Sequence, residues 1–501
     1  MLNNAKALVV VLALALLTFH VCRPIAVQFM REETFARRRN IWLALTVVAF
    51  LSPSFWLWVL TAIVILVPAG RKDANPISLF CLLMFVAPGV NISIPVVGIN
   101  QLFPLSPLRL LAMIVLVPAY LRMRQQAAHR QSTRWADLAM IGFVVLQIAL
   151  LVPYETVTTT MRRSLLLLLD VLLVYFAFSR LSDRAALLDA IASLWLSNVL
   201  MAPVAIFESL RGWLLYPGVA ATWGDPNIFS YLLRGDELRA QAAANHSIGL
   251  GYQAAMGLGL YLLLRTLAPR DRWRDILVIV ALGAATVVSY ARGGWVTALI
   301  FVLLFALLRP EAKRHLPNFV AGAVAVCIAA FFSPLRDKVL QRLPFVGTTD
   351  QDTIGYRQQL SDLGWSLVMQ SPFFGDPFAT DKMAVLRQGQ GIIDIVNGYL
   401  FVALFNGLVG LGLLVSVFAF AIWTVWKTYR RPVDRTAMAI GAGFLSAFLA
   451  TLAFIATAGI GTFTYVLCGL LISYAAMQKP QSWSQRIAPS QATPPNHPRP
   501  A

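Results

Sequence analysis

Runs of apolar residues long enough to cross a bilayer as a helix recur along almost the whole chain. A helix needs roughly 20 mostly apolar residues to span about 30 Å of hydrocarbon. The runs show no alternation of apolar and polar residues and are longer than the strands of a membrane barrel. We therefore predict an all-α, polytopic transmembrane helix bundle with about 12–15 spans. The predicted spans are residues 5–22, 41–53, 55–69, 77–93, 107–121, 136–153, 163–179, 186–208, 247–264, 275–290, 295–308, 318–333, 398–426, 436–456 and 460–477.

The composition excludes a soluble fold for most of the chain. Hydrophobic residues make up 58% and charged residues 13% of the sequence, whereas soluble domains have about 45–50% and about 25%. The cysteines lie in or at predicted spans, far apart in sequence, so we interpret them as packing residues. They are Cys22, Cys81, Cys327 and Cys468. The D-x-D at 350–352 lacks a third ligand and is more typical of a turn, so we predict no metal and no cofactor.

Short basic loops separate alternate spans and indicate how the chain is oriented. These loops are residues 23–40, 121–135, 265–274, 309–315 and 427–435, and the first carries Arg23, Arg31, Arg37, Arg38 and Arg39. Lys and Arg are enriched in cytoplasmic loops, so we place these loops in the cytoplasm and the N-terminus outside, although Lys6 alone favours the reverse. The net charge of +18 then reflects topology, with membrane lipids as partners and no sign of nucleic-acid binding.

This alternation divides the chain into six segments. The large second outside loop is rich in Trp, Phe, Tyr and Gly, which favours a folded cap over a linker. The segments are N-terminal transmembrane helices (1–210), an outside loop (211–245), transmembrane helices with the Arg292 turn (246–333), the large outside loop (334–396), C-terminal transmembrane helices (397–477) and a disordered cytoplasmic tail (478–501).

The short outside turn Ser289–Trp295 places an arginine at the membrane surface. A guanidinium group stays charged at any relevant pH, and its fork of donors matches phosphate oxygens. Arg292, followed by Gly293 and Gly294 that allow close backbone approach, could hold a lipid diphosphate. The alternative is a helix-end arginine that contacts ordinary headgroups, and the turn by itself favours that alternative.

The end of the first outside loop carries a second group of candidates. Arg239 could supply another diphosphate-binding charge, and His246 a group that titrates near neutral pH. Surface ion pairs of Asp236 and Glu237 with the neighbouring arginines are the simpler explanation when this segment is taken alone.

Two aspartates complete the candidate residues. Asp394 and Asn397 are three apart, so they would share one helix face if the helix begins early. Asp394 could deprotonate a sugar hydroxyl, or it could only cap the helix. Asp170 falls in the middle of a predicted span, where a carboxylate is costly and should face the bundle interior.

Four pieces of the sequence occur in a characteristic order. The turn SYARGGW (289–295) precedes two predicted spans and a long outside loop with Arg357, Trp365 and SPFFGDP (371–377). A helix then opens with VNGYL (396–400) and continues with NGLVGLGLL. In this order the chain, from about residue 200 to 430, resembles the O-antigen ligase and polymerase superfamily.

The resemblance implies a glycosyltransferase of the bacterial inner membrane. Such an enzyme takes a glycan from undecaprenyl diphosphate at the periplasmic face and transfers it to an acceptor saccharide, without nucleotide sugars. The product would be exopolysaccharide, capsule or O-antigen, and a chain-length regulator protein would be a further partner. The outside loops would be periplasmic, and Arg239, Arg292 and Arg357 would bind the diphosphate.

The resemblance also suggests roles for residues of the large loop and of the helix that follows it. Asn397 and Tyr399 belong to the motif at the start of that helix and would lie near the glycan. Sugar rings would stack on aromatic side chains of the large loop, namely Tyr356, Trp365, Phe373 and Phe374.

One position departs from the family. Ligases carry a histidine just before the Asn of the motif, where this chain has Val396, which can neither accept a proton nor donate a hydrogen bond. We therefore favour the polymerase branch, with Asp394 or His246 as the catalytic base. An O-antigen ligase proper is one alternative. A lipid-linked oligosaccharide flippase is another, and Asp170 is its best support, because transporters place polar groups near the midplane.

Overall fold

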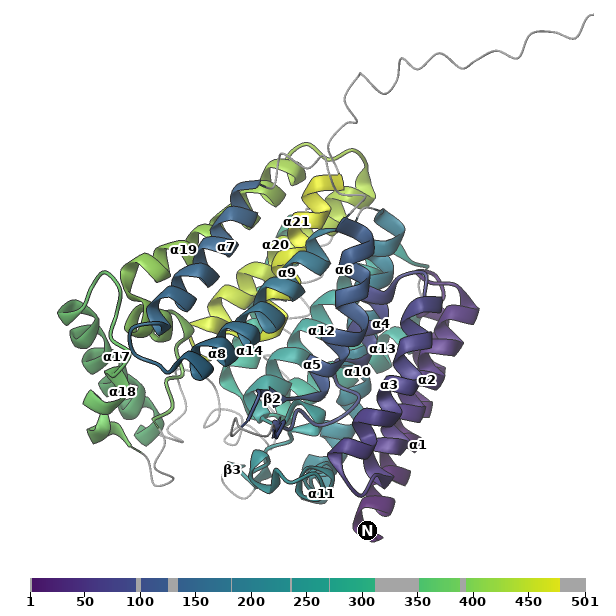
Figure 1. Cartoon of the computed structure of the whole chain (residues 1–501). Helices are drawn as coiled ribbons and strands as arrows, with labels where there is room; N and C mark the ends of the chain where they lie inside the picture. The colour runs from purple at the N-terminus through teal and green to yellow at the C-terminus, as the bar shows by residue number, and fades with distance from the viewer. Residues whose placement is uncertain are drawn as a thin grey trace, which may run out of the picture.

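The structure, a computed structural model, describes residues 2–95, 101–124, 134–181, 183–234, 237–269, 271–310, 351–387 and 393–477. These residues are almost entirely helical (Figure 1). Their strands form two short antiparallel pairs, β1 (Ile92–Ser93) with β2 (Pro104–Leu105) and β3 (Leu233–Arg234) with β4 (Glu237–Leu238). The predicted span at 318–333, Cys327 and the predicted tail lie outside the described residues.

The described helices follow one another along the whole chain. They are α1 (Leu2–Ala26), α2 (Glu32–Leu51), α3 (Phe55–Lys72), α4 (Pro76–Leu83), α5 (Pro107–Leu111), α6 (Val117–Arg124), α7 (Arg134–Leu151), α8 (Val157–Leu167), α9 (Val174–Ser179), α10 (Arg184–Arg211), α11 (Pro217–Thr222), α12 (Ser247–Leu267), α13 (Arg272–Val288), α14 (Arg292–Leu308), α17 (Gln351–Gln370), α18 (Ala379–Lys382), α19 (Gly398–Tyr429), α20 (Arg435–Ile455) and α21 (Thr462–Met477). Two π-helical turns join α5 to α6 and α8 to α9, namely η1 (Ala112–Leu116) and η3 (Leu168–Leu173). Short 3₁₀ turns are η4 (Pro226–Ile228), η5 (Ala242–Ala244) and η6 (Ala384–Leu386).

Seven helices in the described part of the chain are long and apolar enough to span a membrane. They are α1, α3, α7, α10, α12, α19 and α20, and α14 and α21 are shorter apolar helices. The predicted all-α bundle of membrane helices is confirmed. The predicted span at 77–93 differs, because its helix ends at Leu83 and the chain continues irregularly through Pro88. Proline disfavours the helical conformation in the residue before it.

Helices α10, α12 and α20 form the centre of the bundle. At least 78% of the most apolar stretch of each is buried, whereas α1, α3, α7 and α19 bury between 28% and 39% of theirs. The outer helices expose large apolar side chains such as Leu17, Leu60 and Trp423. Lipid-facing helices are expected to do so, because their backbone polar groups are satisfied internally and only side chains meet the hydrocarbon.

Loops predicted to be cytoplasmic gather at one end of the bundle, here called the basic end. Three of them meet around one cavity, which is lined by Arg265, Arg309 and Arg435. Arg38 was predicted to lie in a basic loop, but it lies inside α2 and is 1% exposed. Its Nη1 donates to Asp189 Oδ1 at 2.6 Å and its Nη2 donates to Asp73 Oδ1 at 2.8 Å. The two carboxylates compensate for burying the guanidinium group.

Helix α19 is broken at Gly407, whose φ of 65° and ψ of −172° lie outside the helical region. The SPFFGDP loop accepts the backbone donors that the break releases. Leu408 N donates to Pro372 O at 2.7 Å, and Val409 N donates to Phe373 O at 3.2 Å. A Cβ at position 407 would overlap the Phe373 carbonyl group, so glycine is required. The motifs SPFFGDP and NGLVGLGLL therefore form one unit that docks α17 and α18 on α19.

Candidate functional site

The site is built at the end of the bundle opposite the basic end, where the first outside loop meets the turn between α13 and α14 (Figure 1). Arg234 Nη1 donates to Tyr290 O at 2.6 Å, and Ala240 N donates to Val288 O at 3.1 Å. Tyr290 OH donates to Glu237 Oε2 at 2.7 Å. These bonds join two segments that are distant in sequence into one surface.

Arg239 and Arg292 both belong to this surface. Arg239 Nε donates to Ser289 O at 3.4 Å. Arg292 is the first residue of α14, where the helix dipole adds partial positive charge. A Cβ on the nearby Gly294 would lie 2.6 Å from the backbone carbonyl carbon of Gly251 in α12. The structure therefore explains this glycine by the close packing of α14 on α12, and not by approach to a phosphate.

Arg357, in α17, brings a third segment to the same surface. Burial lowers the pKa of the Arg357 guanidinium, the charges of Arg292 and Arg234 lower it further, and the Asp394 carboxylate opposes the shift. Such effects require these groups to lie within electrostatic reach of one another. We call Arg234, Arg239, Arg292 and Arg357 the arginine cluster. A cluster of like charges favours the binding of an anion with several oxygens, because each guanidinium presents a fork of donors.

His246 is the N-cap residue of α12, and its Nδ1 accepts a hydrogen bond from Ile248 N at 3.2 Å. Desolvation lowers the pKa of His246 below 6.5, the charge of Arg239 also lowers it, and Asp394 raises it. The imidazole is therefore neutral at pH 7. Because Nδ1 is an acceptor, Nε2 carries the proton. In this tautomer His246 donates a hydrogen bond at Nε2 and leaves proton acceptance to a neighbouring group.

Asp394 and His246 line the same cavity of about 460 Å³, together with Gln253 of α12 and Val396. We call it the first cavity. The backbone of Asp394 is fixed by Tyr356 of α17, whose OH accepts from Asp394 N at 3.1 Å and donates to Asp394 O at 3.3 Å. A carboxylate beside a hydrogen-bond donor and a set of guanidinium groups can accept a proton while the cations stabilise a leaving anion.

Asn397, and not Asp394, caps α19. Asn397 Oδ1 accepts from Tyr399 N at 3.0 Å. Asp394 and Asn397 do not share a helix face, because the helix begins only at Gly398 and the residues just before it are not helical. Tyr399 OH donates to Leu452 O at 2.9 Å and ties α19 to α20. Asn397 and Tyr399 thus set the start of α19, whereas Asp394 lines the first cavity.

Two residues of the site were assigned other roles from the sequence. Arg234 was interpreted as part of a surface ion pair, and Tyr356 as a stacking surface for sugars. No local pattern distinguishes these roles, since both depend on segments that only the fold brings near. Trp365 lies on α17 with 38% of its surface exposed, and it does not line any of the three cavities described here.

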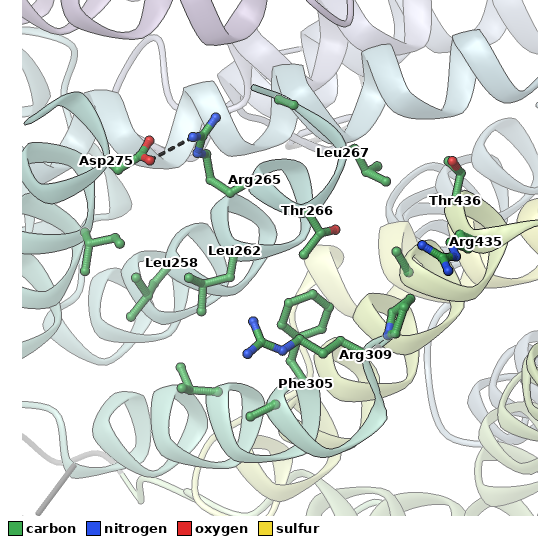
Figure 2. A pocket seen from close by; sticks show the side chains of 16 residues that line it. Leu258, Leu262, Arg265, Thr266, Leu267, Asp275, Phe305, Arg309, Arg435 and Thr436 are labelled. Atoms are coloured by element: carbon green, nitrogen blue, oxygen red, sulfur yellow. Dashed lines mark hydrogen bonds and ion pairs between the residues drawn. The ribbon is translucent and has the colours of Figure 1, made fainter. Parts of the chain in front are cut away.

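A cavity of about 770 Å³ at the basic end contains none of the predicted site residues (Figure 2). Figure 2 shows Arg265 and Asp275 pointing toward one another on one side of it, with Arg309 and Arg435 on the other. Arg265 Nη2 lies 2.7 Å from Asp275 Oδ2. This cavity lies at the other end of α14 from Arg292, so we place no reaction there.

Residues 277–415 match a family model described as O-antigen ligase. Over this segment the chain is similar to the O-antigen ligase family. No curated protein matches the chain closely enough to count as a relative. The resemblance predicted from the ordered motifs is therefore confirmed over this segment, and it lies in a chain with several helices that are long and apolar enough to span a membrane.

The family match covers only part of the site. Arg292, Arg357 and Asp394 fall inside the matched segment, whereas Arg239 and His246 precede it. The latter two join the site through the contacts of the first outside loop with Ser289 and through their electrostatic contact with Asp394. Residues that precede the matched segment thus also contribute to the site.

Proposed function

We propose that this protein is a glycosyltransferase that transfers a glycan from undecaprenyl diphosphate to an acceptor saccharide. The observation that carries the proposal is the arginine cluster beside the first cavity, with Asp394 on the cavity wall. The reaction takes place on the periplasmic face of the inner membrane. The support for this sidedness is that the basic loops gather at the opposite end of the bundle.

In the proposed reaction, the bond between the anomeric carbon and the diphosphate oxygen breaks, and its electron pair leaves with the diphosphate. The arginine cluster stabilises this charge in a partly desolvated site. The acceptor hydroxyl oxygen forms the new glycosidic bond and gives its proton to Asp394. A single displacement inverts the anomeric configuration. His246 Nε2–H supplies a further hydrogen bond to a diphosphate or sugar oxygen.

Polymerisation is the favoured form of this reaction. Val396, which stands where ligases of the family carry a histidine, is one of the residues that line the first cavity. An apolar residue there supports a site whose base comes from elsewhere, and Asp394 is the nearest carboxylate on the same wall. Transfer to a lipopolysaccharide core, as by a ligase proper, is the alternative form.

The flippase alternative loses its main support. Asp170 is not a lone carboxylate, because Arg109 Nη2 donates to its Oδ2 at 2.8 Å and Arg109 Nε donates to the same oxygen at 3.0 Å. The pair carries no net charge. A transport site would instead require polar groups that exchange partners with a substrate near the midplane.

The test uses a deletion strain that expresses single variants. Arg292→Ala and Arg239→Ala should each abolish glycan extension, seen as loss of the polysaccharide ladder on gels, while membrane levels stay normal on immunoblots. Arg211→Ala is the matched control, because Arg211 is an exposed arginine at the same end of the bundle, and it should extend glycans normally. Full extension by either cluster variant contradicts the proposal.

The deletion strain itself separates the two forms of the reaction. A single repeat unit on the acceptor indicates that a polymerase is missing. An unsubstituted acceptor indicates that a ligase is missing. An unchanged ladder removes the glycosyltransferase assignment altogether.

A further inference from the structure

A second cavity, of about 820 Å³, adjoins the first one. Gly461 and Thr462, at the start of α21, line both. The walls of the second cavity come from α7, α8 and η3 on one side and from the SPFFGDP loop and α19 on the other. The kink of α19 at Gly407 holds that loop in place. This cavity is therefore a fixed part of the fold, next to the proposed reaction centre.

The charges of the second cavity differ from those of the first. Arg109 is paired with Asp170, with Nη2 and Oδ2 2.8 Å apart. Arg163 is paired with Glu155, with Nη1 and Oε1 2.9 Å apart. These are the charged residues among the described lining of the cavity. The wall thus offers many hydrogen-bonding groups but no excess charge, which suits a neutral polar ligand better than a diphosphate.

Aromatic side chains also line the second cavity. Phe374 and Phe378 come from the SPFFGDP loop region, and Tyr154 comes from the turn between α7 and α8. Tyr154 and Phe378 meet edge to face, with ring centroids 5.9 Å apart. All three rings are more than half exposed. Exposed rings beside paired ionic and amide groups match a sugar, which has C–H faces for the rings and hydroxyl groups for the polar side chains.

The polar part of the wall is built on an irregular helix. Asp170 lies in the π-helical turn η3, and Arg109 lies in α5, which leads directly into the π-helical turn η1. The two turns pack against each other. Single π-helical turns inside α-helices occur frequently at functional sites, because they redirect side chains at a cost in regular hydrogen bonding.

We propose that the second cavity binds the acceptor glycan through neutral sugar units, while the diphosphate of the donor lies at the arginine cluster. This inference rests on the proposed transferase function, since it divides the two substrates of that reaction between two cavities. The acceptor hydroxyl then reaches Asp394 across the turn at Gly461 and Thr462. The difference in charge between the two cavities decides which substrate each one takes.

The test measures two affinities on the full-length protein in phosphatidylcholine nanodiscs. One probe is the lipid-free oligosaccharide obtained by partial hydrolysis of the host's own surface polysaccharide, and the other is inorganic pyrophosphate. Phe374→Ala should weaken oligosaccharide binding about 2–10-fold, the loss expected for one aromatic stacking contact. Tyr154→Ala, on a different element, should do the same. Neither variant should change pyrophosphate binding, which Arg292→Ala should weaken.

Phe373→Ala is the matched control. Phe373 is the adjacent residue, is 69% exposed and does not line the second cavity, so oligosaccharide binding should stay at the level of the unaltered protein. Equal affinities for all three aromatic variants, or no measurable oligosaccharide binding by the unaltered protein, overturn the acceptor site. Loss of oligosaccharide binding in Arg292→Ala alone also overturns it, because the glycan would then lie in the first cavity.

The two proposals fail in different ways. If pyrophosphate does not bind but oligosaccharide binding depends on Phe374, the diphosphate site is lost and a glycan site remains. If pyrophosphate binding depends on Arg292 but oligosaccharide binding is indifferent to Phe374 and Tyr154, the transferase proposal stands and the acceptor site is lost.

Discussion

Arginines at the two ends of the bundle are held in opposite ways. At the basic end, Arg38 is enclosed by the carboxylates of Asp73 and Asp189, and Arg265 is paired with Asp275. At the other end, the charges of Arg234 and Arg292 act on Arg357. A buried arginine with two carboxylates is neutralised by the fold itself and contributes to architecture. A cluster of arginines favours the binding of an anion with several oxygens. Charge count alone therefore does not identify a site, whereas the grouping of charges does.

The largest effect is expected from removal of the proposed catalytic base. Asp394→Asn should lower glycan extension by at least about 100-fold, because the amide cannot accept the acceptor proton. Extension is measured as the polysaccharide ladder of a complemented deletion strain, with protein level checked by immunoblot. Asp362→Asn, an exposed aspartate of α17, is the control and should be fully active. Retained activity in Asp394→Asn would move the base elsewhere.

The next effect contrasts the two kinds of arginine directly. Arg38→Ala should destabilise the protein by about 3–5 kcal/mol, because Asp189 loses its ion-pair partner and the buried Asp73 keeps only Arg37. Its membrane level and thermal stability in detergent should fall. Arg39→Ala, at the neighbouring position of α2, should leave both unchanged. Arg357→Ala should keep a normal membrane level but lose glycan extension. Equal stability losses for Arg38→Ala and Arg357→Ala would erase the distinction drawn between the two ends.

A smaller effect concerns pH. The folded protein holds the pKa of His246 below 6.5, so the neutral donor form should persist below that pH. Extension should then decline only as the pH falls further and the imidazole becomes charged. The free energy of unfolding should change in the same direction. A His with a depressed pKa binds protons more weakly in the folded state, so its contribution to stability is lost as the pH falls. Initial rates of extension in proteoliposomes between about pH 5 and 8 measure this decline, here called the acid limb.

The variant His246→Asn tests whether His246 causes the acid limb. Asparagine retains the helix cap but has no group at the place of Nε2. We expect extension to fall about 10-fold through loss of one hydrogen bond to a charged group, and the acid limb caused by His246 to disappear. A rate and pH profile identical to those of the unaltered protein would remove His246 from the site.

The smallest effect sharpens how Asp394 is positioned. Tyr356→Phe removes the hydroxyl group that bonds both Asp394 N and Asp394 O. We expect extension to fall about 2–10-fold, in proportion to roughly 0.5–1.5 kcal/mol for a hydrogen bond, without change in membrane level. Trp365→Phe is a control on the same helix and should have no effect, because Trp365 does not line either cavity of the proposed site. A Tyr356→Phe variant with full activity would show that Asp394 is held by other contacts.

The helix bundle was largely predictable, and the site only in part. Long apolar runs determine membrane helices because the bilayer leaves backbone groups no other partners. Prediction was weaker at breaks within these apolar runs. The segment after Leu83 is not helical, and Gly407 interrupts α19. The ordered motifs predicted a resemblance to O-antigen ligases and polymerases, and residues 277–415, which contain all four pieces, match a family model of O-antigen ligase.

The sequence by itself determined the all-α class, the grouping of basic loops and the resemblance to O-antigen ligases, since each depends on local composition or on the order of motifs. Only the tertiary structure decided which candidates meet. It joined Arg239 and His246 to Asp394, gave the capping role to Asn397, and paired Asp170 with Arg109. The physical reason is that capping, pairing and clustering depend on side chains from separate helices. Their distances follow from packing, which no local pattern records.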